Sequence, residues 1–419
     1  MVTFGTRGDV QPFVVLARAL ADRGHEVRVV APRNGEDMAR AADVPYRPLP
    51  MDIQSLLLGE PARRMLASGH LVRSLRWLQN EQQAYATDMR RALIAETESV
   101  DLIVSNQFLE DYCAAIATAR QVAHVPMHPT PLLPSRRFAS VLFTQRGRWR
   151  QLGPLNHLSQ KLSMQMYWRT QRDEVSALRQ ELGVPPAAEM IRSTIARGEA
   201  PCLLGYSQTL FPAPADWPPR AYPAGCLELS PELRTRLGVR GVPSELDDWL
   251  EAGEPPVFLG FGSMPVLDEA ALLRAVRATL ADLGMRGILA AGWSNLETAG
   301  DDTLFVVGDV DHQSLLPRCA AAVHHGGAGT TYAGLAAGLP TLVCSVFFDQ
   351  GFWGSQCQRL GVGATFPFAR LDAKQLASGL RAILDSRVVA RARELAPRLR
   401  DEDGVVAAVT HLENGLDAL

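Results

Sequence analysis

Residues 323–331 have the sequence Val323-His324-His325-Gly326-Gly327-Ala328-Gly329-Thr330-Thr331. The apolar run that precedes them, residues 320–323, predicts a short buried strand, and the residues from Thr330 onward predict a helix. The small residues between them allow a backbone turn to approach a ligand closely. A helix start offers unpaired N–H groups and the positive end of a dipole, which favour binding of a pyrophosphate. This segment therefore predicts a phosphate-binding turn between a strand and a helix.

Further motifs lie on both sides of this turn. Asp349-Gln350 follows it and offers donors and acceptors suited to sugar hydroxyls. Near the start, residues 5–12 form a second glycine-containing turn before a helix, with the sequence Gly5-Thr6-Arg7-Gly8-Asp9-Val10-Gln11-Pro12. Between these motifs lie Phe261-Gly262-Ser263 and Ala291-Gly292-Trp293. A single glycine-rich loop would be weak support for any function, whereas four ordered motifs are specific.

Predicted strands alternate with predicted helices along the chain, which indicates parallel sheets covered on both faces. We expect strands at residues 2–4, 26–31, 101–105, 122–126, 257–261, 288–291, 304–307, 321–323 and 341–344. We expect helices at residues 12–23, 72–96, 158–182 and 267–283. The proline-rich residues 211–225 should continue neither sheet, so the chain is divided into a first domain (1–210), a linker (211–240), a second domain (241–400) and a final helical segment (401–419).

Composition fits a globular enzyme and excludes several other classes. The 419 residues are 47% hydrophobic and 21% charged, and the net charge of −3 gives no indication of nucleic-acid binding. The six cysteines are scattered without a Cys-x-x-Cys pair, so neither a zinc site nor a disulfide framework is expected. No apolar run has the length of a membrane span, and no signal peptide precedes the first strand. These features predict a cytoplasmic protein with reduced cysteines.

Taken together and in this order, the motifs resemble those of glycosyltransferase family 1 in the GT-B superfamily. The resemblance is greatest to the branch that holds sterol, antibiotic, glycopeptide and lipid glycosyltransferases, and it spans nearly the whole chain. It implies an α/β protein with the GT-B fold, in which two Rossmann-like domains face each other across a cleft. The first domain would bind the acceptor and the second the nucleotide sugar, and the last helix would cross back onto the first domain.

Asp9 has two interpretations. From the residues alone, an aspartate after a glycine turn is expected to cap the helix that follows. The resemblance instead implies that Asp9 is the catalytic base, which takes the proton of the acceptor hydroxyl. Arg7 and the helix dipole should both lower the pKa of this carboxyl group. Arg7 and His128 are the other residues assigned to the acceptor side.

On the donor side, the resemblance assigns the diphosphate contact to His324 and leaves His325 to packing. The amides of Gly326, Ala328, Gly329 and Thr330 would bind the phosphates. Ser263 resembles a serine that reaches the phosphates, although it could equally cap a helix. Trp293 resembles the aromatic residue over which the base stacks, although it could equally pack beneath the loop, and His312 falls where relatives bind the edge of the base.

The sequence Asp309-Val310-Asp311 imitates a metal-binding motif of a different glycosyltransferase class. Because no acidic cluster accompanies it, and because a helix start and His324 offset the diphosphate charge, we expect no metal site and no cofactor. The resemblance then implies an inverting transfer of a hexose, with UDP-glucose as the first candidate donor and a dTDP-sugar as the second. The acceptor would be a hydroxyl of a small hydrophobic or aromatic molecule, such as a natural product, sterol or lipid.

Three questions stay open from the sequence. The Arg136–Arg150 segment contains five arginines and no acid, which fits a solvated loop or a lip of the acceptor site that touches an anionic acceptor or a membrane surface. A sugar-nucleotide epimerase with the same fold would bind the same donor. A non-catalytic auxiliary protein would retain the fold but should have lost at least one of Asp9, His324, Asp349 and Gln350.

Overall fold

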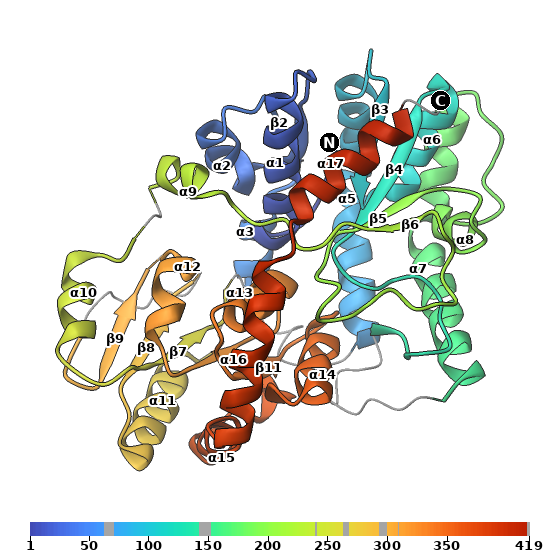
Figure 1. Cartoon of the computed structure of the whole chain (residues 1–419). Helices are drawn as coiled ribbons and strands as arrows, with labels where there is room; N and C mark the ends of the chain where they lie inside the picture. The colour runs from blue at the N-terminus through green and yellow to red at the C-terminus, as the bar shows by residue number, and fades with distance from the viewer. Residues whose placement is uncertain are drawn as a thin grey trace.

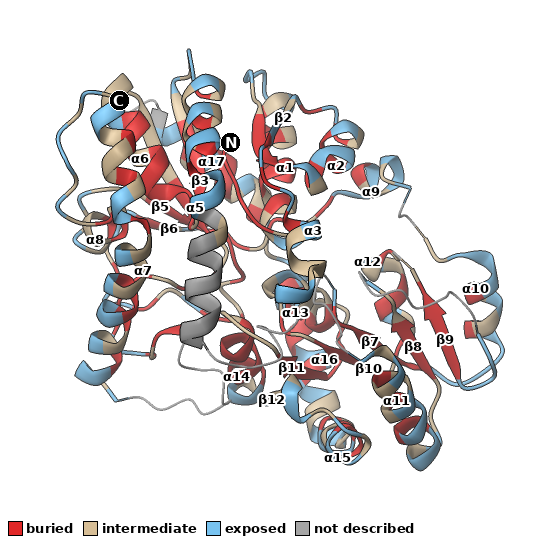
Figure 2. Ribbon diagram, turned by 180° about the vertical axis from the view of Figure 1, so that it is seen from behind, coloured by how far each residue is buried: buried red, intermediate tan, exposed pale blue. Residues whose placement is uncertain are grey.

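The structure is a computed structural model that describes residues 1–62, 71–141, 152–238, 241–262, 268–292, 300–308 and 310–416. Two α/β domains lie one above the other in Figure 1, and the chain passes from the first to the second after residue 225. Buried residues are concentrated in the strands and in the helix faces that cover them (Figure 2). Ser263, Trp293 and Asp309, which were singled out in the sequence, lie outside the described residues.

The first domain is built on a parallel sheet. Its strands are β1 (Val29–Pro32), β2 (Tyr46–Leu49), β3 (Leu102–Asn106), β4 (Ala123–His128), β5 (Cys202–Leu204) and β6 (Ala221–Pro223). Val2 bridges Val30 of β1 and Ser105 of β3, so the strand predicted at the start of the chain is present as a short central link. The helices of this domain are α1 (Arg7–Asp22), α2 (Glu36–Ala41), α3 (Ile53–Leu58), α5 (Leu71–Glu96), α6 (Glu110–Arg120), α7 (Pro154–Glu181) and α8 (Ile191–Ala196).

The second domain has a six-stranded parallel sheet in the order β12-β11-β10-β7-β8-β9. These strands are β7 (Val257–Gly260), β8 (Gly287–Ala290), β9 (Leu304–Val307), β10 (Ala321–His324), β11 (Thr341–Ser345) and β12 (Gly363–Pro367). The helices are α10 (Ser244–Glu251), α11 (Glu269–Leu283), α12 (His312–Leu315), α13 (Ala328–Ala336), α14 (Gln350–Leu360), α15 (Ala373–Ile383) and α16 (Ser386–Arg400). Strands β7, β9, β10 and β11 are buried along their whole length, as expected for a sheet covered on both faces.

The proline-rich segment differs from the prediction. Residues 221–223 form β6, which pairs in parallel with β5 at the edge of the first sheet. An edge strand tolerates proline because only one side of its backbone enters the sheet. The bonds that hold β6 avoid its proline: Cys202 N donates to Arg220 O over 2.9 Å, and Ala224 N donates to Leu204 O over 3.1 Å. The prediction that residues 211–225 continue neither sheet is therefore wrong, and the connection to the second domain runs through α9 (Pro231–Arg236).

An interdomain aromatic cluster joins the two domains. It consists of Phe138, Tyr206, Phe211 and Trp217 from the first domain with Phe352 and Trp353 from α14. The ring centroids of Phe138 and Phe352 are 5.6 Å apart, and those of Phe211 and Phe352 are 5.1 Å apart. The Phe138 side chain is fully buried, so this part of the Arg136–Arg150 segment is core and not a solvated loop. Residues 142–150 of that segment lie outside the described residues.

The last helix, α17 (Gly404–Leu416), returns to the first domain and packs against α1 (Figure 1). Its residues Ala408, Val409 and Leu412 are buried in the same core as Phe13 of α1. This packing makes the C-terminal segment a second connection between the domains. Among the described residues, no helix combines the length and the apolar character needed to cross a membrane.

Candidate active site

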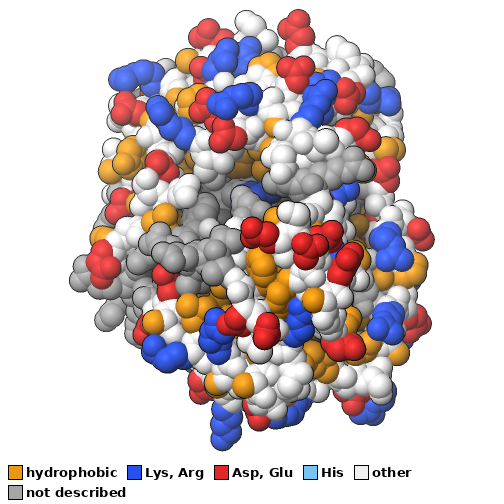
Figure 3. Space-filling model, turned by 90° about the vertical axis from the view of Figure 1, so that its left-hand side faces the viewer, with side chains coloured by type: hydrophobic (Ala, Val, Ile, Leu, Met, Phe, Trp, Pro, Cys, Tyr) orange, Lys and Arg blue, Asp and Glu red, His pale blue; other side chains and the backbone are white. Residues whose placement is uncertain are grey.

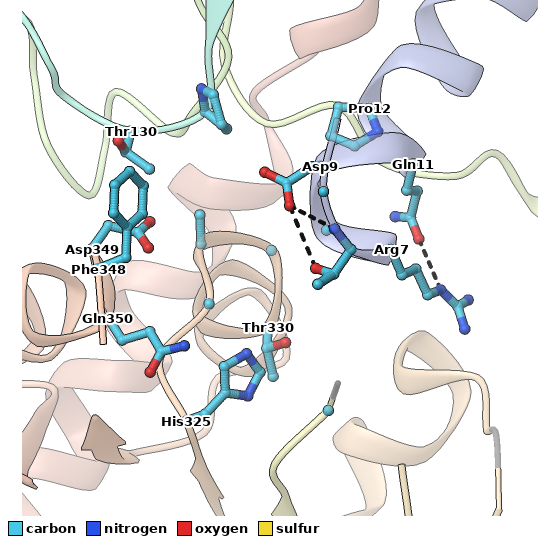
Figure 4. A pocket seen from close by; sticks show the side chains of 18 of the residues that line it. Arg7, Asp9, Gln11, Pro12, Thr130, His325, Thr330, Phe348, Asp349 and Gln350 are labelled. Atoms are coloured by element: carbon cyan, nitrogen blue, oxygen red, sulfur yellow. Dashed lines mark hydrogen bonds between the residues drawn. The ribbon is translucent and has the colours of Figure 1, made fainter. Parts of the chain in front are cut away.

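A cavity of about 970 Å³ lies between the two domains. It is lined by the turn before α1 and the ends of β3 and β4 on one side, and by the turns after β7, β8, β10 and β11 on the other. All these segments follow the carboxyl ends of parallel strands, which is where ligands bind in such sheets. Figure 3 shows the surface hollowed between the domains, and Figure 4 shows the side chains at the centre of the cavity.

Asp9 lies in the first turn of α1 and faces the cavity (Figure 4). Its Oδ2 accepts a hydrogen bond from the Thr6 backbone N–H over 2.9 Å, so Asp9 caps the helix and also lines the cavity. Its Oδ1 accepts a weaker bond from Gln107 Nε2 over 3.4 Å. A Cβ atom at Gly5 would lie 2.2 Å from Asp9 Oδ2, and Gly5 has φ of +139°, so only glycine allows this arrangement.

The pKa of Asp9 differs from the sequence expectation. Burial raises it to about 6, and the hydrogen bonds from Thr6 and Gln107 offset only part of that rise. Arg7, which was expected to lower the pKa, is exposed, and its Nε donates to Gln11 Oε1 over 3.5 Å instead of contacting Asp9 (Figure 4). The prediction of a depressed pKa is therefore wrong, because loss of water contact outweighs the hydrogen bonds that stabilise the ionised carboxylate.

Asp349 is the residue before α14 and Gln350 is the first residue of that helix, and both lie across the cavity from Asp9, on the other domain (Figure 4). Asp349 Oδ2 accepts a hydrogen bond from Trp353 Nε1 over 2.8 Å. Burial raises the pKa of Asp349 to about 7, and the negative charge of Asp9 contributes to the rise. Gln350 Oε1 accepts bonds from the backbone N–H groups of Val346 and Phe347, over 2.7 and 3.1 Å, and thereby holds the loop that presents Asp349.

The turn after β10 leads into α13 at the floor of the cavity. Gly327 is the N-cap residue of α13, and as a glycine it has no side chain that could cap this helix start. The N–H groups of the first helical turn therefore remain available for an anion. Gly327, Ala328, Gly329 and Thr330 all line the cavity.

The two histidines of this turn are placed differently from the expectation. The side chain of His324 is fully buried, its Nδ1 accepts a bond from Gly326 N over 2.9 Å, and it does not line the cavity. His325 does line the cavity (Figure 4). Its ring lies against two glycines, since a Cβ at Gly262 would come within 2.9 Å of His325 Cε1 and one at Gly327 within 2.7 Å of His325 Nε2.

Both imidazole rings are neutral at physiological pH. Burial holds the pKa of His324 well below its ordinary value, with the charges of His325 and His312 as smaller causes. Burial also lowers the pKa of His325, to about 4. A neutral imidazole can donate one hydrogen bond but contributes no positive charge to a diphosphate. The helix start of α13 is therefore the electropositive element of this turn.

His128, which was assigned to the acceptor side, belongs instead to a buried ionic network beneath the cavity. Its Nε2 lies 2.7 Å from Glu110 Oε2, and its side chain is fully buried. Glu110 is also paired with Arg192, and although burial opposes its ionisation, Arg192 and His128 hold its pKa below the ordinary value. Arg192, unlike His128, lines the cavity, so the network supports the acceptor wall from behind.

Asp311 caps α12 and does not stand free. Its Oδ1 accepts from Gln313 N over 3.1 Å, and its Oδ2 accepts from Arg234 and from Ser314 Oγ, each over 2.6 Å. His312 follows it, lines the cavity, and packs its ring on Phe258 with centroids 5.3 Å apart. In the part of the chain that the structure describes, no group of three or more His, Cys, Asp or Glu side chains is arranged to hold a metal ion.

Sequence reasoning missed several residues of the site. Gln107 contacts Asp9 from the end of β3, and Trp353 donates a hydrogen bond to Asp349. The Phe348 ring packs at a tilt of 37° against Phe108, with ring centroids 5.8 Å apart. Trp353 was detectable, because a residue four positions after Asp349 lies on the same helix face. Gln107 carried no signal, because its proximity to Asp9 depends on the pairing of strands distant in sequence.

Comparisons with known proteins agree with this geometry. Residues 1–110 match the model of the glycosyltransferase family 28 N-terminal domain, and residues 293–411 match that of the erythromycin biosynthesis protein CIII-like C-terminal domain. The chain is 31% identical over 424 residues to the O-mycaminosyltylonolide 6-deoxyallosyltransferase of Streptomyces fradiae, covering 99% of this chain and 96% of that protein. It is 33% identical over 423 residues to a sterol 3-beta-glucosyltransferase of Arabidopsis thaliana, covering 98% of this chain but 66% of the longer plant protein.

Solved structures show the same architecture. The glycotransferase of kitacinnamycin superposes with a TM-score of 0.72 at 18% identity, covering 99% of this chain and 98% of that chain. The glycosyltransferase VinC in complex with dTDP superposes with a TM-score of 0.65 at 18% identity, covering 100% of this chain and 99% of that chain. At these identities the likeness shows the fold alone, which is the GT-B fold predicted from the sequence.

The chain therefore belongs to the GT-B glycosyltransferases, in the family that includes sterol and antibiotic glycosyltransferases. It is a nucleotide-sugar-dependent glycosyltransferase, which confirms the class predicted from its motifs.

Proposed function

We propose that this enzyme transfers a hexose, with glucose as the first candidate, from a nucleotide diphosphate sugar to a hydroxyl of a small hydrophobic acceptor, with inversion and without a metal. The observation that carries the proposal is the meeting of Asp9, Asp349 and the start of α13 at one cavity between two domains. The relatives named as a sterol 3-beta-glucosyltransferase and as an O-mycaminosyltylonolide 6-deoxyallosyltransferase support an acceptor of that kind. These relatives give no support to an epimerase or to a non-catalytic protein.

In this mechanism the carboxylate of Asp9 accepts the proton of the acceptor hydroxyl. The resulting oxygen nucleophile attacks the anomeric carbon while the bond from that carbon to the diphosphate oxygen breaks. The amides at the start of α13 stabilise the negative charge that develops on the diphosphate. Because attack and departure take place on opposite faces, a donor with an α linkage gives a β product.

Asp349 and Gln350 are the residues we assign to the sugar hydroxyls. The Asp349 side chain faces the cavity, and one of its oxygens is already held by Trp353, so the other is oriented for a single hydroxyl. For Gln350 the observed bonds to residues 346 and 347 add a second role, which is to shape the loop. Both assignments favour a hexose that retains its hydroxyl groups.

Two features support catalysis without a metal. The start of α13 provides uncapped N–H groups at the phosphate turn. The Asp311 carboxylate, which belongs to the motif that imitates a metal site, is already engaged by four donors, namely Arg234, Gly241 N, Gln313 N and Ser314 Oγ. A direct test is calorimetric titration with UDP and with dTDP in the presence of a chelator. Tight binding of either supports the donor site and its metal independence, whereas binding that appears only on adding a divalent cation contradicts it.

The acceptor side is tested with Asp9→Asn. The amide cannot accept the proton, so transfer should fall by roughly 100-fold to 10,000-fold, the usual contribution of a general base. Because Asp9 lies across the cavity from the phosphate turn, the affinity for the nucleotide diphosphate should stay within error of the wild type. Transfer at the normal rate would show that another residue is the base.

A further inference from the structure

The first half of α7 has an inverted distribution of side chains. Asn156, Gln160 and Ser163 are buried, with exposed fractions of 1, 3 and 8%. Leu155, Leu158 and Leu162 on the other face are exposed, with fractions of 61, 60 and 49%. A helix on the surface of a water-soluble domain normally shows the opposite pattern.

The inward polar face has a clear structural purpose. Asn156 Nδ2 donates to Arg136 O over 3.2 Å, and Gln160 Nε2 donates to Phe138 O over 2.6 Å. Gln160 Oε1 also accepts from Ser135 N over 3.2 Å. The helix thus uses its amides to hold the backbone of residues 135–138, which leads into the interdomain aromatic cluster. These bonds explain the buried polar side chains but give no reason for leucines on the outer face.

We call the exposed leucines here the α7 leucine patch: Leu155, Leu158 and Leu162 on the outer face of the helix, together with Leu152, which lies two residues before it. These four are most of the exposed large hydrophobic side chains in the described chain, where the others are Tyr85 and Val406. Figure 2 shows this end of α7 on the outer side of the molecule, away from the second sheet. Leu155, Leu158 and Leu162 are spaced by three and four residues, so they lie on one face of the helix. Grouped apolar side chains of this kind indicate a contact surface, whereas single exposed leucines need no explanation.

Among the described residues, two cationic side chains lie near the patch. Lys161 lies between Leu158 and Leu162 and is exposed, and residues 154–167 of α7 contain no acidic residue. Arg136 is exposed, and it lies beside α7 because its carbonyl oxygen accepts the hydrogen bond from Asn156 Nδ2. Burial lowers the pKa of His157, and the charges of Lys161 and Arg136 lower it further. Asp216 is the acidic neighbour, and its oxygens accept from Ser135 Oγ over 2.9 Å and from Arg136 N over 2.8 Å.

We infer that the α7 leucine patch docks on the surface of an anionic lipid bilayer, with Lys161 and Arg136 at the level of the lipid headgroups. Leucines that enter the interface beside lysine and arginine are the pattern of peripheral membrane contacts. A symmetric dimer through the same patch is disfavoured, because it would bring the cations of one copy against those of the other. The opposite face of the same helix lines the cavity through Gln160, Ser163 and Met164. Docking would therefore leave only the thickness of α7 between the lipid surface and the cavity.

The test is co-sedimentation of the full chain with vesicles, without donor, so that its outcome is independent of the proposed transferase reaction. Wild type should pellet with vesicles of phosphatidylcholine and phosphatidylglycerol and much less with phosphatidylcholine alone. Leu155→Gln and Leu158→Gln should each weaken the partitioning roughly fivefold, since each removes an apolar side chain from the interface. Val406→Gln, which changes a side chain that is 60% exposed on α17, is the matched control and should bind like wild type.

Charge is tested separately. Lys161→Gln should weaken binding to the anionic vesicles roughly fivefold and leave the weak binding to phosphatidylcholine unchanged. Lys374→Gln, at the only other lysine of the chain, is exposed on α15 and should have no effect. All five variants should transfer sugar to a water-soluble acceptor at the wild-type rate, since none of these residues lines the cavity. Failure of wild type to pellet with anionic vesicles, or leucine variants that bind like wild type, would overturn the inference.

Discussion

The carboxyl group of Asp9 serves the helix and the cavity together. Its Oδ2 caps α1 through Thr6 N, and its Oδ1 meets Gln107. Burial raises its pKa to about 6, which makes it a stronger base than an ordinary aspartate and still leaves it ionised at neutral pH. Capping and catalysis, which were alternatives from the sequence, are compatible because the two oxygens point to different partners.

This pKa gives a pH-dependent prediction. Transfer requires ionised Asp9, so kcat/KM should fall as the pH drops through about 6. Gln107 donates to the carboxylate and lowers its pKa, so Gln107→Leu should move this acidic limb to higher pH. The pH profile of kcat/KM for the two proteins measures the shift. A limb that stays in place in the variant would contradict the proposed role of Gln107.

Asp349 should trade stability for function. The pKa of Asp349 in the folded state is about 7, above the ordinary value. Its favourable contribution to the free energy of unfolding is therefore complete at acidic pH and is lost as the pH rises through about 7. Asp349→Asn keeps an oxygen for Trp353 Nε1 and carries no charge. We expect the variant to have a higher Tm than wild type at pH 8, with a smaller difference at pH 5, and a higher KM for the sugar nucleotide. Thermal unfolding at both pH values tests the first expectation, and a lower Tm at pH 8 would contradict it.

The turn between β10 and α13 depends on where its glycines lie. Gly326 has φ of +96°, and a Cβ there would lie 2.5 Å from Val343 Cγ1 and 2.9 Å from Gln350 O. At Gly329, in the first turn of α13, a Cβ would meet no atom within 4 Å. The two glycines therefore have different roles: Gly326 is required by the backbone conformation and close packing of the turn, whereas Gly329 leaves space on the cavity side.

Gly326→Ala and Gly329→Ala form a matched pair. The first should lower the free energy of unfolding by about 1–3 kcal/mol through backbone strain and overlap. The second should leave it within about 1 kcal/mol of wild type, because alanine favours a helix. Denaturant unfolding of both variants measures the difference. Equal stabilities would mean that the turn relaxes around the new methyl group.

Across the two domains, the interdomain aromatic cluster sets how the halves of the cavity face each other. Phe352 of α14 contacts Phe138 and Phe211 of the first domain, and Arg359 of the same helix donates to Leu210 O over 3.0 Å. Helix α14 also begins at Gln350, directly after Asp349. The element that presents the sugar-binding residues is therefore the element that the first domain packs against.

Phe352→Ala should lower the free energy of unfolding by about 3–5 kcal/mol, the usual cost of removing a buried phenylalanine. It should also lower kcat, because Asp9 and Asp349 would no longer be held at a fixed separation, while the affinity for the nucleotide diphosphate stays unchanged. Phe305→Ala is the control, since Phe305 is 7% exposed and packs on Trp249, within the second domain. It should lower stability without lowering kcat. An equal loss of kcat in both variants would contradict a specific role for the cluster.

The periodic elements were predictable from the sequence, with ends that shift by a few residues. The strands predicted at 257–261, 304–307 and 341–344 appear as β7, β9 and β11, because continuous apolar runs bounded by turns fit only buried parallel strands. The error at residues 211–225 came from treating proline as excluded from sheets, whereas β6 lies at an edge.

The motifs and their order sufficed to give the GT-B fold and the enzyme class, because glycine turns at strand ends and apolar periodicity are local properties of the chain. The environment of each side chain is not local. Whether His324 or His325 reaches the cavity, whether His128 lines it, and whether the pKa of Asp9 rises or falls depend on burial and on partners such as Glu110 and Gln107, which folding brings in from distant segments. Desolvation is a property of the packed structure, so no pattern within a single segment could reveal it.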